Sequence, residues 1–123
     1  MVSLMRYKKT TLSEALREYK NFQHRLNQFL DDFYSSDRAT KELLLKGPPK
    51  TDDMRMLALA DAIATLFKKK YHLKNVKWNG RFGLDRAWFI IPIEKLKPTL
   101  ILQSPGEFRC RNIFVPSNYL ERI

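Results

Sequence analysis

The stretch DDMRMLALADAIATLFKKKY, residues 52–71, decides the fold of this chain. Its apolar residues recur at helical spacing and cover more than half of the circumference of a helix, so no side of that helix can stay in water along its length. Asp52 and Asp53 precede the run and three lysines close it, which is the order of charge that a helix dipole favours. The stretch therefore predicts a buried central helix on which the other elements pack.

A long amphipathic helix is predicted before it, beginning at Thr11 or Ser13, either of which can cap it, and ending near Tyr34. Its apolar residues alternate between spacings of three and four and form one seam. The seam consists of Leu12, Ala15, Tyr19, Phe22, Leu26, Phe29 and Phe33. It can pack on the central helix of the same chain or on its own copy in a homodimer, and the sequence leaves both open.

Shorter helices are predicted elsewhere. Asp37 can cap a helix over residues 38–46, with the leucines at 43–45 as its buried turn, and Gly47-Pro48-Pro49 ends it. A further helix is predicted over residues 93–103, and the residues expected to face inward are Ile93, Leu96, Leu100 and Ile101. Ser104-Pro105-Gly106-Glu107 has the residues of a capping box, so a new helix is predicted with Ser104 as its N-cap.

The expected fold class is mostly α, with a long N-terminal helix, a buried central helix and short C-terminal helices. Residues 11–123 are expected to form a single compact helical domain, and residues 1–10 a flexible basic leader. At 123 residues the chain can bury roughly two thirds of its unfolded surface, which is enough for a hydrophobic core.

Composition argues against membrane and metal-dependent classes. The sequence has no apolar run long enough to span a bilayer and no secretory leader, so we expect a cytoplasmic protein without membrane contact. One cysteine and two histidines allow no internal disulfide and leave too few ligands for a structural zinc site. No metal, no cofactor and no catalytic residue is predicted.

The net charge of +10 is uneven. Residues 68–123 hold 12 of the 23 Lys and Arg residues but only 4 of the 13 acids. Such an excess attracts polyanions or an acidic protein partner. The alternative is that the charge only keeps the protein soluble.

A binding surface is predicted in the basic segment over residues 72–86 and in the short helix that follows residue 104. Bases alternate with aromatic rings there, which suits phosphate contacts and stacking. The predicted partner- or nucleic-acid-binding residues are Trp78, Arg81, Phe82, Arg86, Arg109 and Arg111. Two alternatives stay open: Trp78 and Phe82 can form a lid on the core, and one of the two arginines at 109 and 111 can tie down the fold while the other reaches a partner.

Other reactive residues have simpler interpretations. Arg17 and His24 resemble the R-x(4–6)-H motif of HEPN ribonucleases, in which both residues would project from one helix as phosphate clamp and general base. Cys110 lies between two arginines but has no histidine nearby in sequence, so we expect a buried small apolar residue. Asp61 is expected on a polar face of the central helix, and Asp31 and Asp32 on a solvated one.

Part of the chain, about residues 55–120, resembles a little-characterised family of small bacterial proteins. The resemblance is carried by LALADAIA at 57–64, by Trp78, by Trp88-Phe89, and most distinctively by SPGEFRCRNIFV at 104–115. Members of that family occur beside nucleotidyltransferase-like toxin genes, and some carry a helix-turn-helix segment. The resemblance implies an antitoxin-like or regulatory partner and supplies no catalytic residues. This sequence shows no clear helix-turn-helix of its own.

The predicted function is therefore non-enzymatic: an antitoxin-like interaction protein that neutralises a nucleotidyltransferase-type toxin by covering a substrate or nucleotide site. Because the chain is basic, the toxin would need an acidic surface. The first alternative is a nucleic-acid-binding regulatory protein that uses the same residues. The second is a HEPN-like ribonuclease that uses Arg17 and His24.

Overall fold

The computed structural model describes residues 8–76, 78 and 82–122, and this part of the chain is mostly α-helical, as predicted. The helices are α1 (Leu12–Ala15), α2 (Phe22–Tyr34), α3 (Arg38–Leu44), α4 (Met54–Lys70), the 3-10 turn η2 (Glu94–Leu96), α5 (Lys97–Gln103) and α6 (Gly106–Arg109). Two short strands, β1 (Trp88–Phe89) and β2 (Ile113–Phe114), pair in parallel. None of the described helices is long and apolar enough to cross a membrane.

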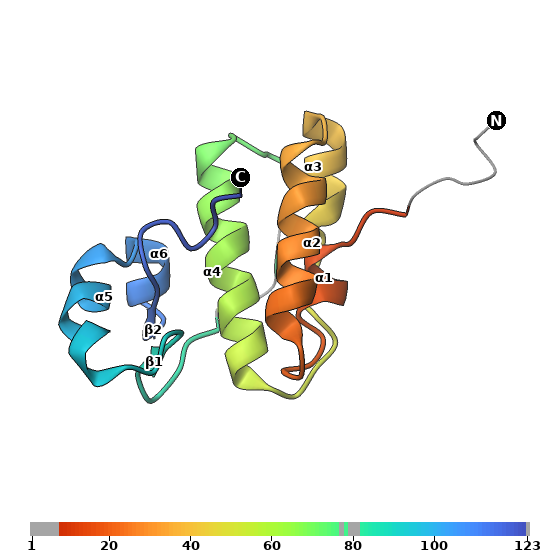
Figure 1. Ribbon diagram of the computed structural model, residues 1–123. Helices are drawn as coiled ribbons and strands as arrows, with labels where there is room; N and C mark the ends of the chain where they lie inside the picture. Colours follow the sequence, from red (N-terminus) through yellow and green to blue (C-terminus); the bar gives the residue numbers. More distant parts are fainter. Residues whose placement is uncertain (1–7, 77, 79–81, 123) are drawn as a thin grey trace.

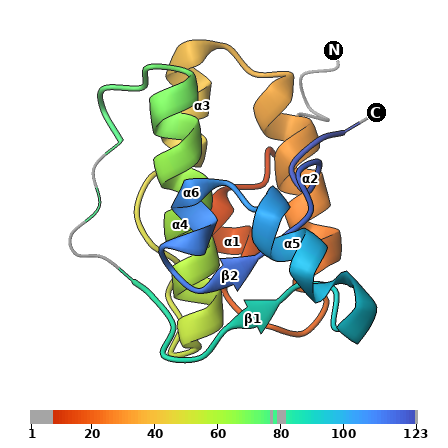
Figure 2. The ribbon, with the colours of Figure 1, turned by 90° about the vertical axis from the view of Figure 1, so that its left-hand side faces the viewer.

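Helix α4 is the central helix that the sequence predicts. It lies between α1–α3 on one side and α5, α6 and the two strands on the other (Figure 1). Figure 2, seen from the side of α5 and α6, shows these two helices and the strands in front of α4 and α2. The Asp53 carboxylate accepts the N–H of Arg55 at the start of the helix, and Lys68, Lys69 and Lys70 form its last turn. Nine of its residues are buried. One of them is Asp61, so the prediction that Asp61 lies on a polar face was wrong.

The predicted long first helix is divided in two. Residues 16–21 form a turn between α1 and α2, and Asn21 takes the left-handed conformation with φ 58°. The guanidinium of Arg25 donates to the carbonyl oxygen of Ala15, the last residue of α1, and to those of Glu18 and Lys20 in this turn. Those carbonyls therefore have partners although the helix is interrupted, and α1 can fold back against α2.

The apolar seam of α1 and α2 packs against other parts of the same chain. Leu12, Ala15, Leu26, Phe29 and Phe33 are all fully buried. The ring of Phe33 stacks on Phe67 of α4 with 4.4 Å between centroids. Packing on the central helix is thus the alternative that the structure shows for the seam, and an aromatic cluster joins α2 to α4.

The start of the chain is only partly described, since residues 1–7 of the predicted leader lie outside the described residues. Lys9 donates to the hydroxyl of Ser36, and the N–H of Thr10 donates to Asp32. Asp32 is buried, so the prediction that it belongs to a solvated face was wrong. Helix α3 begins after the N-cap Asp37, as expected. Leu44 and Leu45 are buried and Leu43 is exposed.

The C-terminal elements differ from the sequence prediction in two respects. Ser104 does not cap α6: its hydroxyl donates to the carbonyl of Leu100 and accepts the N–H of Val115 at 2.8 Å. The serine thus ties the end of α5 to the chain after β2. In the predicted helix over residues 93–103, only Leu100 is buried, whereas Ile93, Leu96 and Ile101 are exposed. The element lies at the edge of the molecule, where it has few neighbours to cover it (Figure 1).

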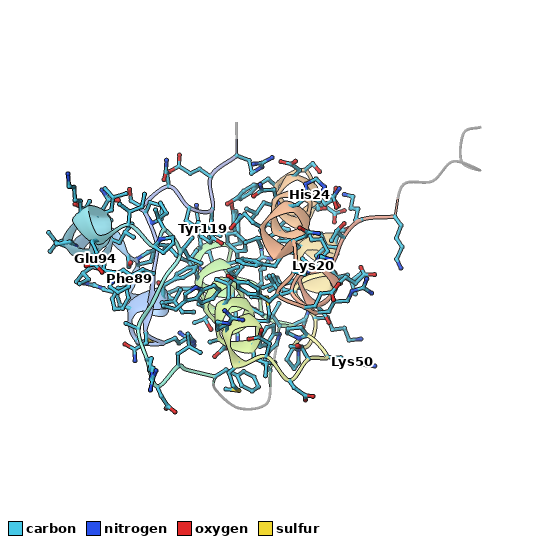
Figure 3. The ribbon with its side chains drawn as sticks, turned by 60° about the horizontal axis from the view of Figure 1, so that its bottom comes forward. Lys20, His24, Lys50, Phe89, Glu94 and Tyr119 are labelled. Atoms are coloured by element: carbon cyan, nitrogen blue, oxygen red, sulfur yellow. The ribbon has the colours of Figure 1, made fainter. Side chains whose placement is uncertain are left out.

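Residues 119–122 close the fold against α2. The Tyr34 hydroxyl donates to the carbonyl of Leu120 at 2.7 Å, and the Tyr119 hydroxyl donates to the side-chain oxygen of Gln23 at 2.6 Å. The Tyr119 ring also meets that of Phe108 edge-on, and Figure 3 shows Tyr119 beside the central helix. Arg122 pairs with Asp31 at 2.8 Å on the surface.

Tyr34 gives a test of this closure. Burial, with smaller contributions from Tyr71 and Glu121, raises the pKa of Tyr34 from 10.0 to about 12. Because the folded pKa lies above the unfolded one, the stabilisation is complete below pH 10 and is lost as the pH rises toward 12. After a rapid pH jump, the tyrosinate absorbance of the wild type minus that of Tyr34→Phe should show a midpoint near pH 12. A midpoint near 10 would mean that water reaches this hydroxyl.

Candidate binding site

A buried ion pair lies at the centre of the candidate site. The Nε of Arg111 donates to Oδ2 of Asp61 at 2.9 Å, and the two residues are 8% and 5% exposed. The same carboxylate oxygen accepts the backbone N–H of Phe82 at 3.0 Å. Asp61 therefore joins α4 to two segments that follow it in the chain. The hydroxyl of Thr65, one turn further along α4, accepts from Nη2 of Arg111 at 3.2 Å.

The position of Arg111 follows from the chain around it. Helix α6 packs on α4, and Nη1 of Arg111 donates back to the carbonyl of Glu107 at the start of α6. Asn112 then takes a left-handed conformation with φ 65°, and its side-chain amide donates to the carbonyl of Leu84. The chain turns there into β2, which pairs with β1. The position of the Arg111 side chain against α4 is thus fixed by α6, which precedes it, and by Asn112 and β2, which follow it.

A cleft of about 180 Å³ opens beside the ion pair. Its lining residues are Asp61, Ala64, Thr65, Lys68, Val76, Trp78 and Arg111. A shallower hollow of about 500 Å³ adjoins it along the last turns of α4 and the segment that follows. Thr65 and Lys68 line both. We call the cleft and the hollow together the α4 cleft.

The rim of the α4 cleft is basic. Lys68, Lys69 and Lys74 line it and are exposed. The Nζ of Lys69 lies 3.9 Å from Oε2 of Glu107. Because the Lys69 side chain is 81% exposed, water screens this ion pair. Neither Lys68 nor Lys74 has an ion pair within the described part of the chain. The site therefore presents cationic groups that protein carboxylates do not neutralise.

The predicted binding residues are only partly brought together. Trp78 and Arg111 both line the cleft, and Phe82 lies beside Arg111 in a smaller adjoining pocket. Arg86 and Arg109 are exposed, and Arg81 lies outside the described residues. Of the two arginines around Cys110, Arg111 ties down the fold through Asp61, whereas Arg109 is exposed.

Trp78 has a structural role as well. Its indole N–H donates to the carbonyl of Leu45 at 2.9 Å, and its ring packs partly buried against the core, as does that of Phe82. The lid alternative and the binding alternative are thus compatible for Trp78, because the same side chain covers the core and lines the cleft.

The remaining reactive residues occupy positions that differ from their predicted ones. Arg17 lies in the turn between α1 and α2, whereas His24 lies in the first turn of α2, so the two do not project from one helix. His24 lies on the α2 side of the molecule, opposite Phe89 and Glu94 (Figure 3). Cys110 is exposed rather than buried. It follows α6 directly and its Sγ accepts from Nη1 of Arg111.

Comparison with known proteins does not help to interpret this site. No family model matches the sequence, and no curated protein or solved structure matches it. The resemblance to the toxin-associated family stays a prediction, and the site has to be interpreted from its own chemistry.

Asp61, Thr65 and Lys68 belong to the site, yet sequence reasoning did not assign them to it. Asp61 could have been found, because it is the only acid inside the apolar run of residues 56–67, and a carboxylate at the centre of a buried helix needs a cationic partner. Thr65 and Lys68 follow it at four and seven residues, on the same side of the helix.

Proposed function

We propose that this protein is a non-enzymatic interaction protein of the antitoxin type, which binds an acidic surface of a partner through the α4 cleft. In line with the resemblance, the partner is a nucleotidyltransferase-type toxin, which the protein neutralises by covering a substrate or nucleotide site. The observation that carries the proposal is the pair of exposed lysines, Lys68 and Lys74, that line a preformed hollow without an ion pair in the described residues.

Charge and shape have separate roles in such a complex. Unneutralised lysines at a rim accelerate the encounter with an acidic partner and fix its orientation. Affinity comes mainly from groups that are buried in a pocket at the centre of the interface. The α4 cleft offers both, because Lys68 lines the cavity together with Trp78, Val76 and Ala64, and Lys69 and Lys74 line the adjoining hollow.

A nucleic-acid-binding regulatory protein is the second candidate. Trp78 favours it, since an aromatic ring beside Lys68 and Arg111 is the combination that stacks a base next to its phosphate. Salt separates the two candidates. Binding that depends on phosphate contacts falls linearly with the logarithm of salt concentration, and an interface with an apolar centre depends on salt much less.

The test is a pull-down of the tagged protein from a lysate of its source organism at moderate salt, with and without nuclease. We expect one acidic protein in stoichiometric amount that survives nuclease, and mass spectrometry would then show whether it has a nucleotidyltransferase sequence. Recovery of nucleic acid alone, lost on nuclease treatment, would reject the interaction-protein proposal in favour of the second candidate.

A further inference from the structure

The α4 cleft also indicates what kind of segment the partner inserts. We propose that it binds a short acidic peptide segment of the partner, with one carboxylate in the cleft against Arg111 and Lys68 and an apolar side chain in the adjoining hollow. This inference rests on the proposed function and specifies the chemistry of the partner at the same site.

Arg111 has a donor available for that carboxylate. A guanidinium carries five N–H donors. In Arg111, Nε donates to Asp61, Nη1 to the Glu107 carbonyl and to Cys110 Sγ, and Nη2 to Thr65. The second N–H of Nη2 has no partner among the described residues. Arg111 lines the cleft although it is nearly buried, so a carboxylate that reaches it is bound with little competition from water.

The charge of the cleft favours an anion. Asp61 is already paired with Arg111 and also accepts the Phe82 N–H. Lys68 therefore adds a positive charge that nothing in the described cleft offsets. Because an ion–carboxylate contact in a partly desolvated site is stronger than one in open water, a carboxylate in the cleft gains from the second Nη2 N–H of Arg111 and from Lys68, which both line it.

The hollow favours a peptide over a nucleic acid. Its lining residues are Thr65, Lys68, Lys69, His72, Leu73 and Lys74, and the exposed surface of this lining is almost entirely apolar. Lysine stems cover apolar surface while their ammonium groups stay in water. An apolar floor with a cationic rim suits an amphipathic acidic segment, in which leucine-like and glutamate-like side chains alternate. The phosphate groups of a nucleic acid offer no aliphatic side chain for the floor.

Two matched double variants test the inference. Lys68→Glu with Lys74→Glu reverses the rim, and Lys20→Glu with Lys50→Glu makes the same change in net charge elsewhere. Neither Lys20 nor Lys50 lines the cleft or the hollow, and Figure 3 shows both on the α2 side of the molecule. All four lysines are exposed, so both variants should fold. The probes are a fluorescent peptide of alternating glutamate and leucine and a fluorescent single-stranded oligonucleotide of equal charge.

We expect the rim variant to bind the peptide at least about tenfold more weakly than the wild type, because two interface ion pairs are lost and two repulsions replace them. The control variant should lose less than about threefold. In a Trp88→Phe background, Trp78 is the only tryptophan, and its emission should change when the peptide enters the cleft.

Three results would overturn the inference: equal weakening by both variants, tight binding of the oligonucleotide but not the peptide at the rim, or no peptide binding by the wild type. The proposed function can be judged separately. If the pull-down recovers an acidic partner and the rim variant retains it, the protein is still an interaction protein, but the partner does not bind at the α4 cleft. If the wild type recovers no protein, the function itself fails.

Discussion

Replacing Arg111 with methionine is expected to lower the free energy of unfolding by about 3–5 kcal/mol, because it leaves the buried Asp61 carboxylate without a cation. The substitution keeps much of the side-chain length and removes the Nε and Nη donors to Asp61, Glu107 and Thr65. Urea denaturation followed by circular dichroism measures the change, and the midpoint should fall while the slope stays constant.

A matched control lies two residues away. Arg109 is exposed, so Arg109→Met should change the stability by no more than about 0.5 kcal/mol. Adding Asp61→Asn to Arg111→Met removes the unpaired charge, while the amide oxygen can still accept the Phe82 N–H. The double variant should therefore be more stable than the sum of the two single changes predicts. Additive effects would show that the two charges do not interact.

Phe67→Ala is expected to lower the free energy of unfolding by a similar amount, about 3–5 kcal/mol. Phe67 is fully buried, stacks on Phe33, and meets Tyr34 and Tyr71 edge-on. Truncation would remove one ring from the centre of this cluster and leave a cavity between α2 and α4. Because both helices contribute to that interface, neither can close the cavity without moving several aromatic neighbours.

Phe67→Leu is the natural comparison, since it retains most of the apolar volume and should cost clearly less than the alanine variant. Both can be measured by the same urea titration. If the alanine variant loses no more stability than the leucine variant, the stacked pair would contribute little to the junction of α2 and α4.

Helix α4 was predictable because all the sequence features that indicate it lie within the helix or next to it. Its apolar period, its N-terminal acids and its C-terminal lysines all lie within twenty consecutive residues. Helix α3 was predictable for the same reason, with Asp37 as a local N-cap. The interruption at residues 16–21 was not, because the spacing of the apolar seam continues through it. The side chain of Arg25 stabilises the turn by donating to three carbonyls. The spacing of apolar residues in a sequence carries no information about such a contact.

The candidate site was predictable in part. Composition pointed to Trp78 and to the arginines near residue 110, since rings and bases are visible in the sequence wherever they lie. The pairing of Asp61 with Arg111 spans 50 positions and depends on how α6 docks. Ser104 was assigned to the wrong backbone group for a similar reason: the local pattern of a capping box was present, but Val115 N–H became its partner.

The contacts of residues 119–122 with α2 have a consequence for how the chain folds. Tyr119 and Gln23 are 96 residues apart, and Arg122 and Asp31 are 91 apart. Most helical proteins gain their speed from contacts between neighbours in sequence, and the entropy of closing long loops slows chains that lack them. Here the helices can form early, but the core is sealed only when segments from opposite ends of the fold meet. We therefore expect the search for that encounter, rather than the growth of helices, to set the rate of folding.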